Sequence, residues 1–254
     1  MKKVIYTCLA GDYDRLAQPE AVRRDWDYIC FTERDGKDGV WELRRIPPEI
    51  GNDAVTLSRY PKLLPHAVLP DYELSVYMDA NIRITGDSFY DAVEALAGSG
   101  TVYAGLPHPR RDCVWEELRF CYLKGKISTG AAFRHHAFLR RELVPRHWGL
   151  YENNVIVRLH NDPAAVALDD LWWKLFLSCS GRDQLTLVPA LLKTGIRPSL
   201  ILGEGVCARN SDCLGYTLHP SALKNNTPGR VTWGDFMYHV RLAFRKTVLL
   251  FFLK

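Results

Sequence analysis

The chain has 254 residues, of which 47% are hydrophobic and 24% are charged, so we exclude a disordered protein and expect a substantial core. The formal net charge of +4 comes from residues 230–254, since residues 1–229 sum to zero, and this argues against a broad nucleic-acid-binding surface. The seven cysteines form no CxxC pair and are odd in number, which indicates neither a disulfide framework nor a thiolate zinc site, and a reduced, cytoplasmic protein is expected.

Short apolar runs alternate with helix-like segments along the chain. We predict strands at residues 3–10, 26–33, 40–46 and 74–80, with a broken helical stretch at 51–69. Beyond them we predict helices near 87–99, 113–125, 163–178 and 181–195, and strands near 101–106, 128–134 and 154–160. This order indicates an α/β fold whose sheet is parallel in its first half. No repeat or composition break precedes residue 230, so we expect one domain over 1–229 and a tail over 230–254.

The apolar stretch at residues 4–10 is short and is followed at once by acids, so we interpret it as a first strand and not as a signal peptide. The chain contains no G-x-G-x-x-G motif and no phosphate-binding P-loop motif. Dehydrogenase and ATPase functions are therefore disfavoured.

The strand at 74–80 is followed by polar side chains. Asp79 and Asn81 would share one face if the extended conformation continued through Ala80. Ligands of open α/β sheets bind outside the carboxyl ends of the strands, and two oxygen ligands there suit Mg²⁺ or Mn²⁺ completed by a diphosphate. The alternative is a polar turn that only ends the strand, because Asp and Asn favour turns.

The segment YMDANI is similar to the D-x-D-type signature of nucleotide-sugar-dependent glycosyltransferases of the GT-A fold. Together with further segments in residues 6–185, it makes the chain resemble a glycosyltransferase-like family, formerly a domain of unknown function, that is found in bacteria and in plant proteins linked to cell-wall polysaccharide. The other matching segments are YTCLAGDYDRL, YICFTE, RYPKLLPH, HPRRDCVWEEL, GLYENNVIVRLHN and WWKLFLSCSGRDQL. This resemblance implies a GT-A-like mixed, largely parallel sheet flanked by helices, a nucleotide-sugar donor, and Mn²⁺ or Mg²⁺. Asn81 replaces a second acid of the signature and removes a negative charge from the predicted cation site.

Three cationic side chains precede the strand at 74–80. Arg59, Lys62 and His66 are spaced i, i+3 and i+7, and they would share one face if the two prolines of the segment permit a helix. Such a face could hold phosphates, or it could be an ordinary solvated surface. The family resemblance favours Lys62 and His66 as donor-binding residues.

A second basic segment begins the predicted helix at 113–125. Arg111 could pair with a diphosphate. Alternatively, Asp112 could cap the helix while Glu116 and Glu117 occupy its solvated first turn.

Two carboxylates are candidates for catalysis. Asp183 could hold sugar hydroxyls or take a proton from the acceptor, with Gln184 as its hydrogen-bonding neighbour. The S-x-x-D spacing of Ser180 and Asp183 is also typical of a capping box, which would explain the acid structurally. Glu152, before the strand at 154–160, is a second candidate base or a surface acid.

The resemblance to GT-A enzymes adds residues at both ends of the domain. Tyr6, Thr7 and Asp14 flank the exit of the first strand, where GT-A folds bind the nucleotide base and ribose. His219 is a candidate metal ligand because GT-A enzymes often complete the cation site with a C-terminal histidine. The alternative is that His219 is a loop residue.

The tail at 238–254 places Arg241 and Arg245 on one helix face and ends in an apolar run too short to span a bilayer. It could lie in a membrane interface, or dock on the core or on a second subunit.

We therefore expect a glycosyltransferase that moves a sugar from a nucleotide sugar to a hydroxyl of a glycan or lipid-linked glycan in surface polysaccharide, lipopolysaccharide or capsule assembly. We expect it in the cytoplasm, with peripheral attachment to the inner face of the cytoplasmic membrane if the tail binds lipid. The alternatives are a non-catalytic sugar-nucleotide or glycan-binding module and a metal-dependent nucleotidyltransferase. No nucleic-acid partner is expected, and the sequence predicts no particular oligomeric state.

Overall fold

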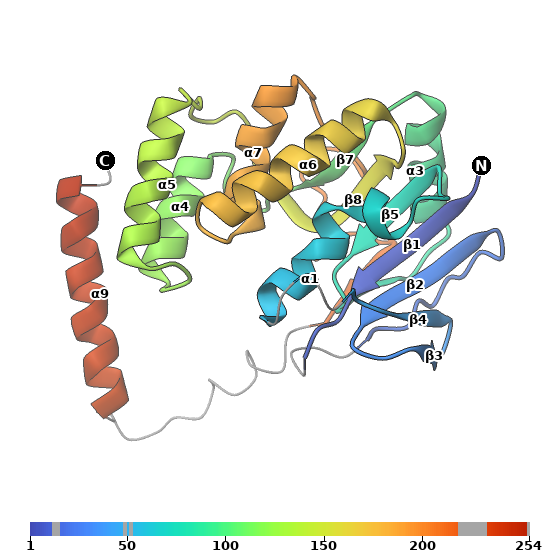
Figure 1. The fold of residues 1–254 in the computed structure, drawn as a ribbon, viewed down its shortest axis with the longest axis horizontal. Coiled ribbons are helices and arrows are strands. Elements are labelled where there is room, and N and C mark those ends of the chain that lie inside the picture. Colours follow the sequence, from blue (N-terminus) through green and yellow to red (C-terminus); the bar gives the residue numbers. More distant parts are fainter. Residues whose placement is uncertain (12–15, 48–49, 51–52, 218–232, 253–254) are drawn as a thin grey trace.

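A computed structural model describes residues 1–11, 16–47, 50, 53–217 and 233–252 (Figure 1). The main sheet has the strand order β3-β4-β2-β1-β5-β8-β7-β9, and a small second sheet pairs β10 with β6. The strands are β1 Lys3–Cys8, β2 Trp26–Thr32, β3 Gly36–Asp38, β4 Trp41–Arg45, β5 Leu74–Met78, β6 Ile82–Ile84, β7 Tyr103–Pro107, β8 Tyr151–Leu159, β9 Ser199–Leu200 and β10 Leu214–Tyr216. The helices are α1 Ala54–Leu63, α2 Pro65–Val68, α3 Ser88–Gly98, α4 Val114–Leu123, α5 Thr129–Arg141, α6 Pro163–Ser178, α7 Asp183–Thr194 and α9 Trp233–Phe252.

Strands β4, β2, β1 and β5 are mutually parallel, as the sequence predicts for the first half of the sheet, whereas the short edge strand β3 runs antiparallel to β4. β1 pairs in parallel with β2 and β5, and β2 pairs in parallel with β4. β8 runs antiparallel to both of its neighbours, β5 and β7. The start of β8 therefore lies beside the carboxyl end of β5, which brings two chain segments more than 70 residues apart to one edge of the sheet. The predicted mixed, largely parallel α/β sheet flanked by helices is confirmed.

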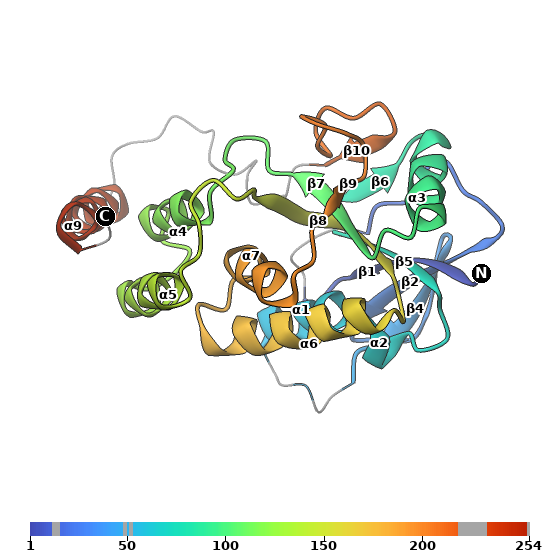
Figure 2. The ribbon, with the colours of Figure 1, turned by 90° about the horizontal axis from the view of Figure 1, so that it is seen from above.

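Each face of the sheet is covered by a different set of elements. Helices α1, α6 and α7 lie on one face, and α3 lies with the β6–β10 sheet on the other (Figure 2). On the first face α6 buries Leu168 and Trp172 in a core that extends to α4 and α5. On the second face α3 buries Phe89 and Val93.

The strand predicted at 128–134 is wrong, because the segment is the first half of α5. The hydroxyl of Ser128 caps this helix by accepting a hydrogen bond from the amide of Ala131 at 3.2 Å. Burial of Ala131, His135 and Phe138 then follows helical spacing. Strands β3, β6, β9 and β10 are two or three residues long and were not predicted, since such segments are too short to show an alternation of apolar and polar residues.

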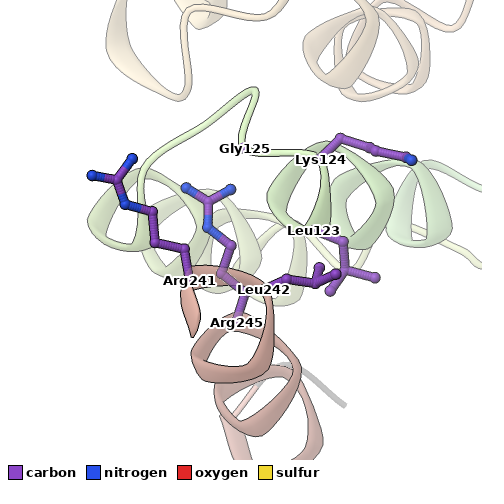
Figure 3. A pocket seen from close by; sticks show the side chains of 6 residues that line it. All are labelled: Leu123, Lys124, Gly125, Arg241, Leu242 and Arg245. Atoms are coloured by element: carbon purple, nitrogen blue, oxygen red, sulfur yellow. The ribbon is translucent and has the colours of Figure 1, made fainter. Parts of the chain in front are cut away.

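Helix α9 docks on α4. Val248 is 7% exposed, and the guanidinium of Arg245 donates a 2.6 Å hydrogen bond to the carbonyl of Tyr122. Arg241 and Arg245 extend from the same side of α9 toward Gly125, as their spacing predicts (Figure 3). Within the described residues, no helix has the length and apolarity needed to cross a bilayer. Docking on the core is thus one role of the tail, and the division into a 1–229 domain and a tail stays a prediction.

Candidate active site

A polar pocket opens where β5 ends and β8 begins. The last turn of α1, the start of α7 and the chain around β10 complete its wall. Four lining side chains are cationic and three carry a carboxylate, and the full set is Arg59, Lys62, Asp79, Glu152, Asn153, Asn154, Arg182, Asp183, Gln184, Arg209 and Tyr216. The pocket therefore combines groups that bind anions with groups that accept hydrogen bonds from hydroxyls.

Lys62 and Asp183 form the central ion pair of the pocket. Lys62 Nζ lies 2.8 Å from Asp183 Oδ2, and both side chains are almost fully buried. Arg59 Nε lies 3.5 Å from the same oxygen. Burial alone would raise the pKa of Asp183, but the charges of Lys62 and Arg59 outweigh it and hold that pKa well below its ordinary value. Asp183 is therefore a fixed negative charge at neutral pH.

Asp79 directly follows β5 and lies close to this ion pair. Its Oδ1 accepts a 2.8 Å hydrogen bond from the hydroxyl of Tyr77 and lies 3.6 Å from Lys62 Nζ. The Asp79 side chain is 37% exposed, whereas that of Asp183 is 7% exposed. Among the three acids of the pocket, Asp79 thus has the most accessible carboxylate.

Asn81 does not share this orientation. The amide of Ile82 donates to the carbonyl of Asp79 at 2.9 Å, so the chain turns at Ala80 and Asn81, and the extended conformation that a shared face would require does not occur. Asn81 is buried, and its Nδ2 donates a 2.8 Å hydrogen bond to the carbonyl of Thr217. This bond fastens the chain after β10 to the end of β5, and the Asn81 side chain is not part of the pocket lining.

Glu152 lies at the start of β8 and contacts Arg209. The guanidinium of Arg209 donates to Glu152 Oε1, and the other carboxylate oxygen accepts from Asn154 Nδ2 at 3.1 Å. Arg209 also lies over the Tyr216 ring, 4.4 Å from its centroid. Glu152 is 8% exposed, so it is not the solvated surface acid that the sequence left as an alternative.

The start of α7 places Asp183 and Gln184 in the pocket. The predicted capping box is wrong, since Arg182 is the N-cap and the buried Ser180 hydroxyl has no hydrogen-bond partner among the described residues. Instead, the indole of Trp172 donates a 3.0 Å bond to the carbonyl of Asp183. Gln184 Nε2 donates to the carbonyl of Tyr151 at 3.2 Å, which ties α7 to β8. The position of Asp183 is thus held by tertiary contacts.

Four predicted donor-binding residues lie outside the pocket lining. Tyr6 and Thr7 are buried, and the Tyr6 hydroxyl accepts from Arg158 at 3.2 Å. The helical stretch breaks at Leu64, so His66 contacts Asp170 instead, at 3.3 Å. The fourth residue, Arg111, pairs with the buried carboxylate of Glu117 at 2.7 Å and stacks on Phe120. Glu117 is therefore not a solvated residue of the first helical turn.

The predicted residues Asp14 and His219 lie outside the described residues. No cluster of three or more His, Cys, Asp or Glu side chains suited to a metal ion occurs in the described part of the chain. Asp79 nevertheless fits one ligand position for Mg²⁺ or Mn²⁺, because such ions are often held by one or two carboxylates together with substrate phosphates.

Sequence reasoning missed five lining residues. Asn153 and Asn154 follow Glu152 directly, and a pair of amides opening a buried strand was a usable signal. Arg182 adjoins Asp183 and was equally visible. Arg209 and Tyr216 come from the region after β9, and no local pattern marks them, since only the packing of that region brings them to the pocket.

Residues 28–199 match the TOD1/MUCI70 glycosyltransferase-like domain family. Because this match covers more than half of the chain, the protein belongs to that family. The predicted resemblance to a glycosyltransferase-like family is thereby confirmed, and the fold has the predicted mixed α/β class. None of the curated protein sequences matches this chain.

Several solved structures have a similar chain arrangement. Mouse xyloside xylosyltransferase 1, in its apo form, aligns with 78% of this chain and 83% of its own at 7% identity and a TM-score of 0.44. Core-mannan synthase A from Aspergillus fumigatus, in a Mn/GDP form, aligns over 75% and 69% at 9% identity, with a TM-score of 0.42. The bifunctional glycosyltransferase WbbM aligns over 96% and 44% at 8% identity, with a TM-score of 0.43.

Proposed function

We propose that this protein transfers a sugar from a nucleotide-sugar donor to a hydroxyl of a glycan acceptor, in the assembly of surface polysaccharide, lipopolysaccharide or capsule. The observation that carries the proposal is the pocket at the carboxyl end of β5, where three carboxylates and four cations converge. The cations suit a diphosphate and the carboxylates suit sugar hydroxyls. Membership in a glycosyltransferase-like family supports the same reaction class.

The cations would stabilise the departing nucleoside diphosphate. Negative charge develops on the leaving phosphate, and fixed cations in a partly buried site stabilise it without reorganisation. Lys62 is held in place by Asp183, and its backbone carbonyl accepts a 3.0 Å hydrogen bond from the buried Arg158. Arg59, Arg182 and Arg209 supply further donors at the same pocket.

The two predicted catalytic carboxylates differ in their suitability as bases. Asp183 is a weak base because Lys62 and Arg59 hold its pKa well below the ordinary value, so it would orient sugar hydroxyls. Glu152 pairs with Arg209, whose side chain is 44% exposed and could turn toward a bound phosphate. Glu152 would then be left to orient or deprotonate the acceptor hydroxyl.

Mn²⁺ or Mg²⁺ would be held by Asp79 together with the donor diphosphate. When bound, the ion would supply additional positive charge to the leaving group. Asp79 has the accessible carboxylate this requires, and Tyr77 fixes its orientation.

We also propose that the protein works in the cytoplasm, at the inner face of the cytoplasmic membrane, on glycan or lipid-linked glycan acceptors. The support is helix α9, which exposes Val240 and Phe244 one turn apart beside exposed Arg241 and Lys246. A basic helix with exposed apolar side chains suits an anionic membrane surface.

The decisive experiment combines thermal stabilisation with product analysis. A panel of nucleotide sugars is tested for a rise in melting temperature, since a ligand that binds only the folded state stabilises it. Release of a nucleoside diphosphate from the stabilising donor supports the proposal. Release of pyrophosphate would identify a nucleotidyltransferase, and binding without turnover in the presence of glycan acceptors would identify a binding module.

A further inference from the structure

A β-bulge shapes the pocket wall at the start of β8. Gly105 of β7 pairs with Ile156, but the next residue, Leu106, pairs with Glu152. Residues 153–155 of β8 therefore have no paired residue in β7. On the other side the amide of Asp79 donates to the carbonyl of Asn154 at 2.8 Å, which keeps the bulged segment beside β5. In a regular strand, successive side chains alternate between faces. Here Glu152, Asn153 and Asn154 all line one pocket, and bulges next to active sites commonly re-aim side chains in this way.

The amide of Asn153 is buried without a hydrogen bond. The residue is 6% exposed, and neither Oδ1 nor Nδ2 has a partner in the described parts of the chain. Its neighbour Asn154 has an unpartnered Oδ1, although its Nδ2 binds Glu152. Leaving a buried polar group unpaired costs roughly 1–3 kcal/mol, and buried polar groups are otherwise almost always paired. An unpaired amide on a residue that lines a polar pocket therefore calls for a partner, and a ligand in that pocket can supply one.

The chemistry of a side-chain amide limits the class of ligand that Asn153 can bind. A side-chain amide offers a donor and an acceptor side by side, so a metal ion would use only its oxygen and a phosphate only its nitrogen. A sugar hydroxyl, which donates and accepts, satisfies both. The carboxylates of Glu152 and Asp183 and the amide of Gln184 line the same pocket and can engage adjacent hydroxyls.

We propose that Asn153 recognises a hydroxyl group of a sugar bound in this pocket. This assignment rests on the proposed glycosyl transfer and adds the residue that selects the sugar. The hydroxyl can belong to the donor sugar or to the acceptor, and the two sources give different results below.

The test replaces Asn153 with leucine, which has a similar shape and no polar atoms. The free variant should melt at or above the wild-type temperature, because no protein hydrogen bond is lost. If the donor sugar is the ligand, a nucleotide sugar should bind roughly tenfold more weakly, while the nucleoside diphosphate alone binds as in wild type. If the acceptor is the ligand, donor binding should persist and the KM for acceptor should rise by a similar factor.

Asn161→Leu is the matched control. The Asn161 amide donates to the carbonyls of Pro70 and Tyr72 at 2.6 and 2.8 Å, away from the pocket. This variant should melt at a lower temperature but retain the affinity for donor and acceptor.

Two results would overturn the assignment, and they are distinguishable. If wild type responds to nucleotide sugars and Asn153→Leu retains both donor affinity and acceptor KM, the role of Asn153 is refuted while the proposed function stands. If no nucleotide sugar stabilises or reacts with the wild type, the proposed function fails and the role of Asn153 fails with it.

Discussion

Lys62 Nζ lies 2.8 Å from Asp183 Oδ2, and this ion pair joins the last turn of α1 to the first residue of α7. The same ammonium lies 3.6 Å from the Asp79 carboxylate at the end of β5. One buried cation thus connects three elements whose sequence positions span more than 120 residues. Its removal should affect both stability and donor binding, and the two effects can be separated.

Lys62→Met should lower the free energy of unfolding by about 3 kcal/mol, because it leaves the buried Asp183 with Arg59 as its remaining close cation. The double variant Lys62→Met/Asp183→Leu should recover much of this loss, since no unpaired charge remains. Neither variant should bind a nucleoside diphosphate as wild type does. Urea unfolding and ligand-induced thermal shifts measure the two quantities. Wild-type donor affinity in the double variant would contradict a role for this pair in the site.

Asp79→Asn should abolish any enhancement of nucleotide binding by Mn²⁺ while changing stability little, because the Asp79 side chain is 37% exposed. Asn81→Ala should do the opposite. It removes the bond to the carbonyl of Thr217, which costs about 1 kcal/mol, but it leaves the Mn²⁺ response in place. Titrating Mn²⁺ against the nucleotide-induced melting shift tests both variants. Loss of the Mn²⁺ response in Asn81→Ala would restore Asn81 as a metal ligand.

Glu152→Gln should retain donor binding and lower kcat for transfer by roughly 100-fold or more, since general-base catalysis contributes about that much. Gln keeps the size of the side chain and can still accept a hydrogen bond from Asn154. Arg209→Gln is the companion variant, because it frees Glu152 from its partner and removes a cation. It should weaken nucleoside diphosphate binding. Initial rates at saturating donor separate transfer from binding, and an unchanged kcat in Glu152→Gln would exclude Glu152 as the base.

Buried His135 should make the protein less stable in mild acid. Burial lowers the pKa of His135 to about 4, while the unfolded chain has the ordinary value near 6.5. Between these values the unfolded state binds a proton that the folded state does not, so the free energy of unfolding falls as the pH falls from 6.5 to 4. Wild type should lose about 2 to 3 kcal/mol more than His135→Gln between pH 7 and about pH 4.5.

The glutamine variant retains an N–H that can replace the 3.2 Å hydrogen bond of His135 to the carbonyl of Leu185. Urea unfolding of both proteins at the two pH values gives the difference, and other titrating groups largely cancel because both proteins contain them. Equal pH dependence in wild type and variant would show that the pKa of His135 is the same in the folded and unfolded states, and would refute the prediction.

Two substitutions in α9 should separate core docking from membrane contact. Val248→Ser should destabilise the packing of α9 on α4, because Val248 is 7% exposed. Phe244→Ser should leave the melting temperature unchanged, because Phe244 is 60% exposed, and should weaken binding to anionic vesicles. Co-sedimentation with anionic and with neutral vesicles measures this contact. Wild-type protein that binds neither kind of vesicle would refute the proposed membrane contact.

Local sequence patterns predicted much of the fold, and together with the family resemblance they named several residues that line the polar pocket. The strand ending at Met78 and the polar residues after it were visible because a continuous apolar run and the turn preference of the residues that follow it are local properties. Lys62, Asp79, Glu152, Asp183 and Gln184 were all named from the sequence, and all five line the pocket. The segment at 128–134 was misassigned because a short run of small residues fits both the alternation of a strand and the spacing of a helix. Only the cap at Ser128 and the rest of the segment identify the helix.

The sequence by itself determined the alternation of strands and helices and the acids that follow particular strands, because these depend on neighbouring residues. Only the tertiary structure decided which of those acids meet which cations. The bulge that places Asn153 in the pocket lining, the hydrogen bond of Asn81 to Thr217, and the position of Arg209 beside Glu152 all depend on contacts between distant segments. Such contacts are set by strand register and by the packing of the chain after β9. The hydrophobic periodicity of neighbouring residues does not reveal either of them.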